Sequence, residues 1–115
     1  MCLDRKTVKE ILKRVRPRIG YKYFIRNKDL YNCMFMNDLV GGRWYFCYNP
    51  TERIGSTMAG FHFFRSIASA LKARCMFDDG DVLCKIEYLH PVAFGSQYGA
   101  AAGVAHAIRI IKEIN

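Results

Sequence analysis

The stretch Gly60-Phe61-His62-Phe63-Phe64 runs directly into Arg65-Ser66-Ile67-Ala68-Ser69-Ala70-Leu71-Lys72-Ala73. Aromatic side chains are typical of β-strands, whereas Ala, Leu and Lys favour an α-helix. We therefore expect a short aromatic strand over 60–64, followed at once by a helix from about Arg65 to Cys75. This strand-to-helix unit sets the expected class of fold.

Other segments around this unit have the alternation of apolar and polar residues that predicts strands. From Ile19 to Arg26 the chain alternates, the turn residues Asn27-Lys28-Asp29 follow, and Leu30 to Met36 is expected to return as a hairpin. Arg43 to Tyr48 is aromatic on both faces and is predicted to be a central strand. Residues 49–57 are predicted to form a loop. The strand over 82–88 should end at Pro91, which lacks an N–H donor.

The C-terminal segment allows two interpretations. Ala100 to Ile114 is rich in Ala, Ile, Lys and Glu and suits a helix. The β-branched residues Ile108, Ile110 and Ile111 instead suit a strand from about His106, preceded by a loop through Gly103. We favour the strand.

The N-terminal segment is predicted to be a basic amphipathic helix. Asp4 can cap it, and Val8, Ile11, Leu12 and Val15 recur at helical spacing until Pro17 ends the helix. The predicted fold is α+β: a mostly antiparallel sheet with this helix and a second helix after the aromatic strand. We expect one domain over 1–115, divided into a basic helix (1–18) and a sheet-based core (19–115).

Composition indicates a folded protein with affinity for anions. Hydrophobic residues make up 51% of the 115 residues, which is enough for a packed core. The formal net charge is +8, and ten basic residues lie within 5–28 against few acidic ones. Such a field attracts nucleic acid, nucleotides or an acidic protein. A solubilising surface is the simpler alternative.

The cysteines, histidines and apolar runs point to no disulfide framework, metal site or membrane span. Five cysteines are widely spaced without a C-x-x-C pair, so we expect reduced thiols. No apolar run approaches the roughly 18 residues of a membrane span, and no signal peptide is recognisable at the N-terminus. We expect no cofactor, no metal and no membrane association.

Three segments are candidates for a functional site. His62 could be an acid–base catalyst, but a histidine among phenylalanines more often has a structural or ligand-contact role. Arg53, Ser56 and Thr57 flank Gly55 in a loop that offers the donors a phosphate needs. The glycines of 95–103, with Tyr98 between them, suit either a mobile flap or a plain connection.

Aromatic and basic side chains elsewhere could complete such a site. Trp44, Tyr45 and Tyr48 follow Arg43, and aromatic rings of this kind can stack on a base, although they are more often part of a core. The set of ligand-binding candidates is therefore Arg43, Trp44, Arg53, Ser56, Thr57, His62, Arg65, Tyr98 and Arg109. The alternative nucleic-acid surface consists of Lys6, Lys9, Lys13 and Arg14.

Four sequence pieces, in this order, resemble a scattered family of small viral, phage and bacterial modules with a Gly-aromatic-His-Phe/Cys box. They are GYKYF (20–24), GFHFF (60–64), GDVLCKIE (80–87) and IRIIKEI (108–114). The resemblance covers about 21–114 and favours a C-terminal strand that closes the sheet. Some relatives have Cys after the box histidine where this chain has Phe63. The family has no agreed activity, so the resemblance implies a fold and a viral setting.

These observations together predict a phage or viral accessory protein that counters host antiviral defence. We expect it to act in the host cytoplasm by stoichiometric binding of an anionic, nucleotide-type signal, and to form a homo-oligomer. One alternative is an inhibitor that binds nucleic acid, a nucleoprotein or a host protein through the N-terminal basic face. The other is a small nucleotide-processing enzyme that uses His62.

Overall fold

The computed structural model describes residues 16–33, 36–47, 53–54, 57–58 and 60–114. Its strands are β1 (Arg18–Asn27), β2 (Leu30–Asn32), β3 (Trp44–Phe46), β4 (Arg53–Ile54), β5 (Thr57–Met58), β6 (Phe61–Phe64), β7 (Asp81–Gln97) and β8 (Ala100–Ile114). The helix α2 (Ile67–Lys72) and the 3₁₀ turn η1 (Arg74–Met76) follow β6. All the strand pairs are antiparallel.

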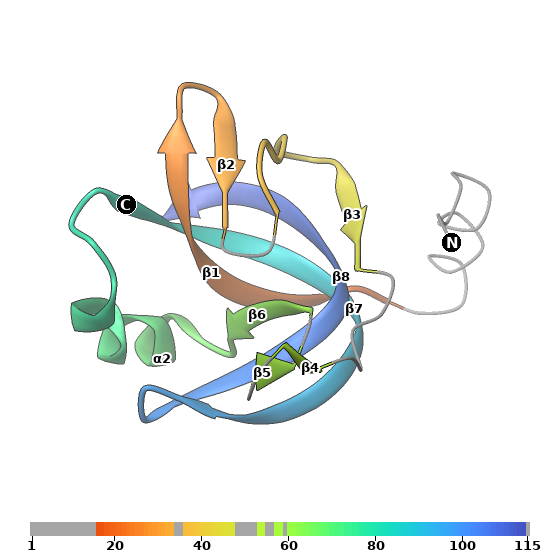
Figure 1. Cartoon of the computed structure of the whole chain (residues 1–115), viewed down its shortest axis with the longest axis vertical. Coiled ribbons are helices and arrows are strands. Elements are labelled where there is room, and N and C mark those ends of the chain that lie inside the picture. Colours follow the sequence, from red (N-terminus) through yellow and green to blue (C-terminus); the bar gives the residue numbers. More distant parts are fainter. Residues whose placement is uncertain (1–15, 34–35, 48–52, 55–56, 59, 115) are drawn as a thin grey trace.

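Four of these strands close into a ring (Figure 1). β1 pairs with β7 along one edge and with β6 along the other, because Tyr21 is opposite both Lys85 and Phe64. β8 likewise pairs with β7 along one edge and with β6 along the other. β2 pairs with the last residues of β1, and β3 pairs with the middle of β8. The result is a small β-rich domain built on a closed ring of antiparallel strands.

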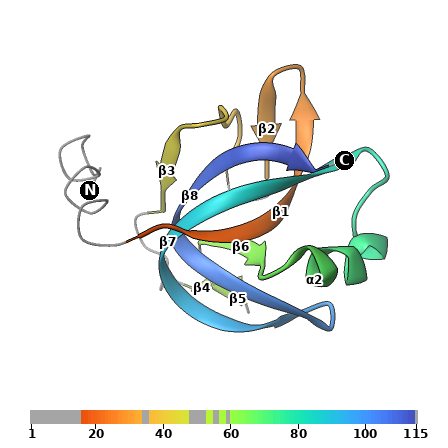
Figure 2. The ribbon, with the colours of Figure 1, turned by 180° about the vertical axis from the view of Figure 1, so that it is seen from behind.

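β7 and β8, which are two strands of this ring, form one long, curved hairpin (Figure 2). Register shifts between Lys85 and Ile86, and between Pro91 and Ala93, bend the pair, as β-bulges do. The hairpin turn has positive φ at both Tyr98 and Gly99, which is the conformation of a type I′ turn. The segment 95–103, predicted to be a flap or a connection, is therefore the tip of this hairpin.

Two apolar clusters hold the structure together. The first lies within the ring, and its largest fully buried side chains include Phe24, Phe61, Phe63 and Ile108. The second joins the other face of the strands to α2 and contains Tyr23 and Phe64.

The short helix α2 is fixed at two points. At its N-terminus the Ser66 hydroxyl accepts a hydrogen bond from the Ser69 N–H at 3.0 Å, which is a typical N-cap. The Tyr23 hydroxyl donates to the Ala70 carbonyl at 2.7 Å. These contacts seat α2 against β1 and the second apolar cluster.

The predicted α+β class is wrong. Within the described residues α2 is the one α-helix and spans six residues, because the predicted helix from Arg65 changes to a 3₁₀ turn after Ala73. The amphipathic helix predicted over 5–15 lies outside the described residues, and Arg18, assigned to the helical segment 1–18, begins β1.

Several strand boundaries also differ from the predictions. β3 pairs only with β8 among the described strands and is an edge strand, not a central one. β7 continues through Pro91, where a bulge accommodates a residue without an N–H donor. The predicted loop over 49–57 contains β4 and the first residue of β5, and the C-terminal strand starts earlier than His106.

Candidate anion-binding pocket

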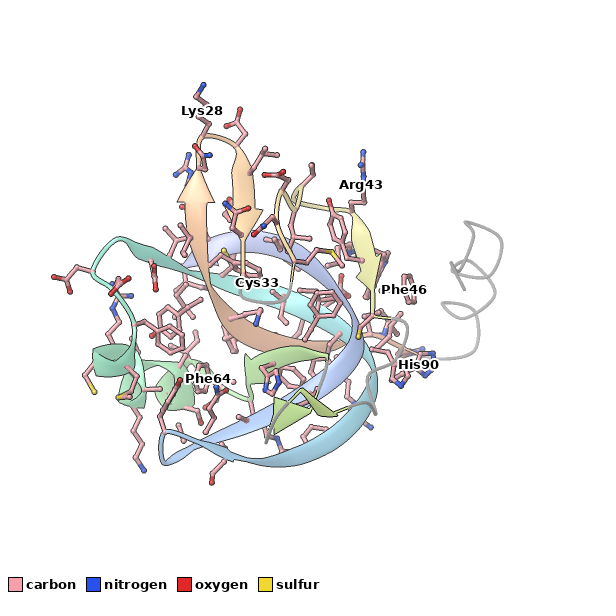
Figure 3. The ribbon with its side chains drawn as sticks, in the orientation of Figure 1. Lys28, Cys33, Arg43, Phe46, Phe64 and His90 are labelled. Atoms are coloured by element: carbon pink, nitrogen blue, oxygen red, sulfur yellow. The ribbon has the colours of Figure 1, made fainter. Side chains whose placement is uncertain are left out.

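A surface pocket of about 100 Å³ lies where the start of β1 meets the middle of β7. Six residues line it: Arg16, Arg18, Tyr88, Leu89, His90 and Pro91. Three of them carry a guanidinium or imidazole group and none is acidic. Figure 3 shows His90 at the bend of the long hairpin, at the opposite end of the molecule from α2.

The two arginines reach the pocket because they are two residues apart in extended chain. Arg18 is directly opposite Tyr88 in the pairing of β1 with β7. Pro17 disfavours helical geometry at Arg16, and side chains at i and i+2 of an extended chain lie on the same face. Both arginine side chains are exposed.

His90 owes its position to an irregularity of β7. Its φ is +52°, a left-handed conformation that non-glycine residues seldom adopt, and the bulge at 91–93 follows directly. Left-handed backbone interrupts the regular alternation of faces along a strand. Strained residues of this kind concentrate at functional sites.

A second histidine lies against the first. The ring centroids of His90 and His106 are 6.2 Å apart, in an edge-to-face arrangement. Burial, with a smaller contribution from the nearby His90, lowers the pKa of His106 below its ordinary value of 6.5. The folded protein therefore resists protonation of this imidazole.

This pKa shift predicts an acid-sensitive stability. The unfolded chain binds a proton at His106 more readily than the folded chain, so the free energy of unfolding should decrease as the pH falls below 6.5. Above that pH the contribution is constant. The His106→Gln variant should show a flatter dependence of melting temperature on pH between about 7 and 5. An unchanged slope in the variant would exclude His106 as the source.

The pocket offers cationic donors but no free aromatic face. Tyr88 is buried, and its ring stacks on Phe63 with centroids 4.1 Å apart. Guanidinium groups bind phosphate and carboxylate oxygens through paired hydrogen bonds. The lining therefore suits an anionic group and not a stacked base.

The structure brings two predicted site residues, Trp44 and Arg109, together elsewhere on the sheet. They are opposite each other in β3 and β8, and the Arg109 guanidinium lies 5.2 Å from the centre of the Trp44 ring. Glu87, the partner of Arg109 on β7, forms an ion pair with it. The charge of Arg109 is thus compensated, and its guanidinium covers the Trp44 ring expected to stack on a base.

Glu87→Ala should lower the free energy of unfolding by about 0.5–1 kcal/mol, because this ion pair is partly exposed to solvent, with side-chain exposures of 34% for Arg109 and 18% for Glu87. The double variant Glu87→Ala with Arg109→Ala should cost less than the sum of the two single variants. Urea unfolding of the four proteins measures the coupling. If the effects of the two single variants on the free energy of unfolding add up to that of the double variant, the ion pair does not stabilise the fold.

The other predicted ligand residues are dispersed. Arg65 lies over the Phe94 ring at 4.6 Å, and the exposed Tyr98 contacts Phe77 with ring centroids 5.9 Å apart. Both belong to the α2 end of the molecule, whereas Arg43 is exposed beside β3 at the other end (Figure 3). The predicted nine-residue pocket is therefore not assembled as one site.

The remaining predicted residues are placed only in part. The half-buried His62 lies on β6, and its carbonyl accepts a hydrogen bond from the Lys22 amine. Arg53 is in β4 and Thr57 in β5, while Ser56 lies outside the described residues. Lys6, Lys9, Lys13 and Arg14 also lie outside them. No disulfide joins the four cysteines that the structure describes, Cys33, Cys47, Cys75 and Cys84.

Sequence reasoning missed the pocket although it noticed its residues. Arg16 and Arg18 belong to the basic segment 5–28, and the sequence predicts that the strand over 82–88 ends at Pro91. The Arg-x-Arg spacing in extended chain was a usable signal. The contact of this tripeptide with β7 depends on strand pairing between residues about 70 positions apart in the sequence, which no local pattern shows.

Comparison with protein-family models, curated proteins and solved structures finds no match for this chain. The resemblance to the viral, phage and bacterial modules therefore stays a prediction. In the part of the chain that the structure describes, no helix is long and apolar enough to cross a membrane.

Proposed function

We propose that this protein binds an anionic ligand stoichiometrically, with a phosphate group held by Arg16, Arg18 and His90. The observation that carries the proposal is a pocket with two arginines, one histidine and no acidic residue in its lining. A hydrogen bond to a charged group contributes about 1.5–3 kcal/mol. Two arginines acting together would give an affinity that is easily measured.

The size of the pocket limits what it encloses. Sites for whole drug-sized ligands are typically about 300–1,000 Å³, whereas this one is about 100 Å³. It would hold the phosphate and leave the rest of the ligand outside. A nucleotide-type signal of host defence remains our proposed ligand, supported by the net charge of +8 and by the resemblance to viral modules.

Binding to nucleic acid is the second candidate. Arg16 and Arg18 come two and four residues after Arg14 in the sequence, so both belong to the same basic segment. A nucleic acid would contact several phosphates at once, and its affinity would fall steeply with salt. A single phosphate in the pocket would give a slope of about one.

Titration calorimetry tests the proposal with three probes: inorganic phosphate, a nucleoside 5′-monophosphate and the corresponding uncharged nucleoside. We expect saturable binding of inorganic phosphate and of the nucleoside 5′-monophosphate, each with one molecule bound per chain. We expect no binding of the nucleoside. A single-stranded oligonucleotide tested over a range of salt concentrations separates the two candidates. Equal binding of nucleoside and nucleotide, or no binding of any phosphate, would contradict the proposal.

The same samples test the enzyme alternative. After incubation with excess protein and heat denaturation, the nucleotide should be recovered chemically intact by mass spectrometry. A modified product that disappears in the His62→Gln variant would show that the protein is an enzyme.

A further inference from the structure

Lys22 is a lysine whose amine lies in an apolar part of the ring, separate from the proposed pocket. It is on β1 opposite Cys84, and Cys84 and Phe24 both belong to the apolar cluster within the ring. The Lys22 Nζ donates to the main-chain oxygen of His62 at 2.7 Å and lies 5.8 Å from the centre of the Phe24 ring.

Among the residues that the structure describes, no acid forms an ion pair with this amine. The ion pairs between described side chains are those of Arg26 with Glu113 and of Arg109 with Glu87, and neither includes Lys22. Burial lowers the pKa of Lys22 below its ordinary value of 10.5, with the nearby Cys33 opposing the shift. A buried ammonium without a carboxylate is costly, so the neutral amine is favoured here more than at the surface.

We propose that Lys22 is a covalent binding site for a small aldehyde or ketone. A lysine in apolar surroundings is the type of amine that forms Schiff bases in proteins, because its neutral form carries the lone pair that attacks a carbonyl. The hydrogen bond to the His62 oxygen uses an N–H of the amine and fixes the direction of the nitrogen. This proposal is independent of anion binding by Arg16, Arg18 and His90.

The reaction conserves atoms and needs no oxidant. The Lys22 nitrogen attacks the carbonyl carbon, and the carbonyl oxygen takes a proton to give a carbinolamine. Loss of water, formed from that hydroxyl and a proton, then leaves an imine, and hydrolysis reverses it. Lys22 is partly exposed to solvent, and so is the nearby Cys33. A compact carbonyl compound is therefore the expected ligand.

Reductive trapping in the wild-type protein tests this proposal. The full chain is incubated with substoichiometric acetaldehyde and cyanoborohydride at pH 7, where hydride reduces any imine to a stable ethylamine. Peptide mass mapping then compares Lys22 with Lys28, Lys72 and Lys112, three exposed lysines in the same molecule. We expect Lys22 to be ethylated several-fold faster than these three lysines, since burial lowers its pKa and so raises the fraction of neutral amine.

The internal comparison makes the result independent of variant folding. The preference for Lys22 should shrink at high pH, because protonation then no longer limits the reaction of ordinary lysine amines. In Lys22→Arg the fast site should vanish, whereas Cys33→Ser should retain it, because a thiol adduct is not trapped by hydride. Ethylation of Lys22 no faster than of Lys28 at pH 7 would overturn the proposal, whether the cause is access or reactivity.

Discussion

Replacing Gly103 with alanine should lower the free energy of unfolding by about 1–3 kcal/mol, the usual cost of adding a methyl group to a packed core. A Cβ atom at this position would lie 2.6 Å from Phe63 Cζ and 3.0 Å from Phe94 Cδ1. The Phe63 ring cannot move away easily, because it is stacked on Tyr88 and is within 2.8 Å of the position of a Cβ at Gly20. Two glycines on different strands thus make room for one ring.

Gly95→Ala is the matched control, because Gly95 is on the same hairpin and a Cβ there meets nothing within 4 Å. Alanine at that position should be neutral or stabilising by up to about 1 kcal/mol, since glycine weakens a strand. Combining Gly103→Ala with Phe63→Leu should cost less than the sum of the two single variants. Equal melting temperatures for Gly103→Ala and Gly95→Ala would show that the ring is not confined.

Local patterns in the sequence predicted much of the sheet. Strands were predicted around Tyr21, Phe61 and Val82 and near the C-terminus because alternation and β-branched or aromatic residues are local signals, and strands lie there, although β7 and β8 are longer than predicted. The same signals give wrong predictions where contacts between distant segments determine the local structure. Pro91 is tolerated at a bulge, and the type I′ turn at 98–99 converts an expected flexible segment into the tip of a strand pair.

The candidate site was less predictable than the fold for a related reason. Aromatic residues such as Trp44 have the same composition signature whether they bind a base or pack against a neighbour. In this protein the Trp44 ring packs against Arg109, which is paired with Glu87 on the adjacent strand. The proximity of these residues follows from the register of β3, β8 and β7. The basic segment indicates the positive charge of the pocket. It does not indicate that His90, from β7, lines the pocket together with Arg16 and Arg18.

The pocket itself predicts the largest change in ligand affinity. Arg16→Ala combined with Arg18→Ala should weaken binding of a nucleoside 5′-monophosphate by at least about 2 kcal/mol, or roughly thirtyfold, because both guanidinium groups lining the pocket are lost. Both side chains are exposed, so the melting temperature should change little. Calorimetric titration of the variant beside the wild type measures the difference.

A loss of net charge alone would also weaken anion binding, so the control must remove the same charge elsewhere. Lys72→Ala with Lys112→Ala does this at two exposed positions on α2 and β8 that do not line the pocket. Long-range attraction is screened beyond about 8–10 Å at ordinary salt concentrations, so this control should bind the nucleotide within about twofold of the wild type at 0.15 M salt. Equal weakening in both double variants would mean that the protein attracts anions through its overall field. Selective weakening in the arginine variant would instead place the phosphate between β1 and β7, where two strands distant in sequence bring Arg16, Arg18 and His90 to one pocket.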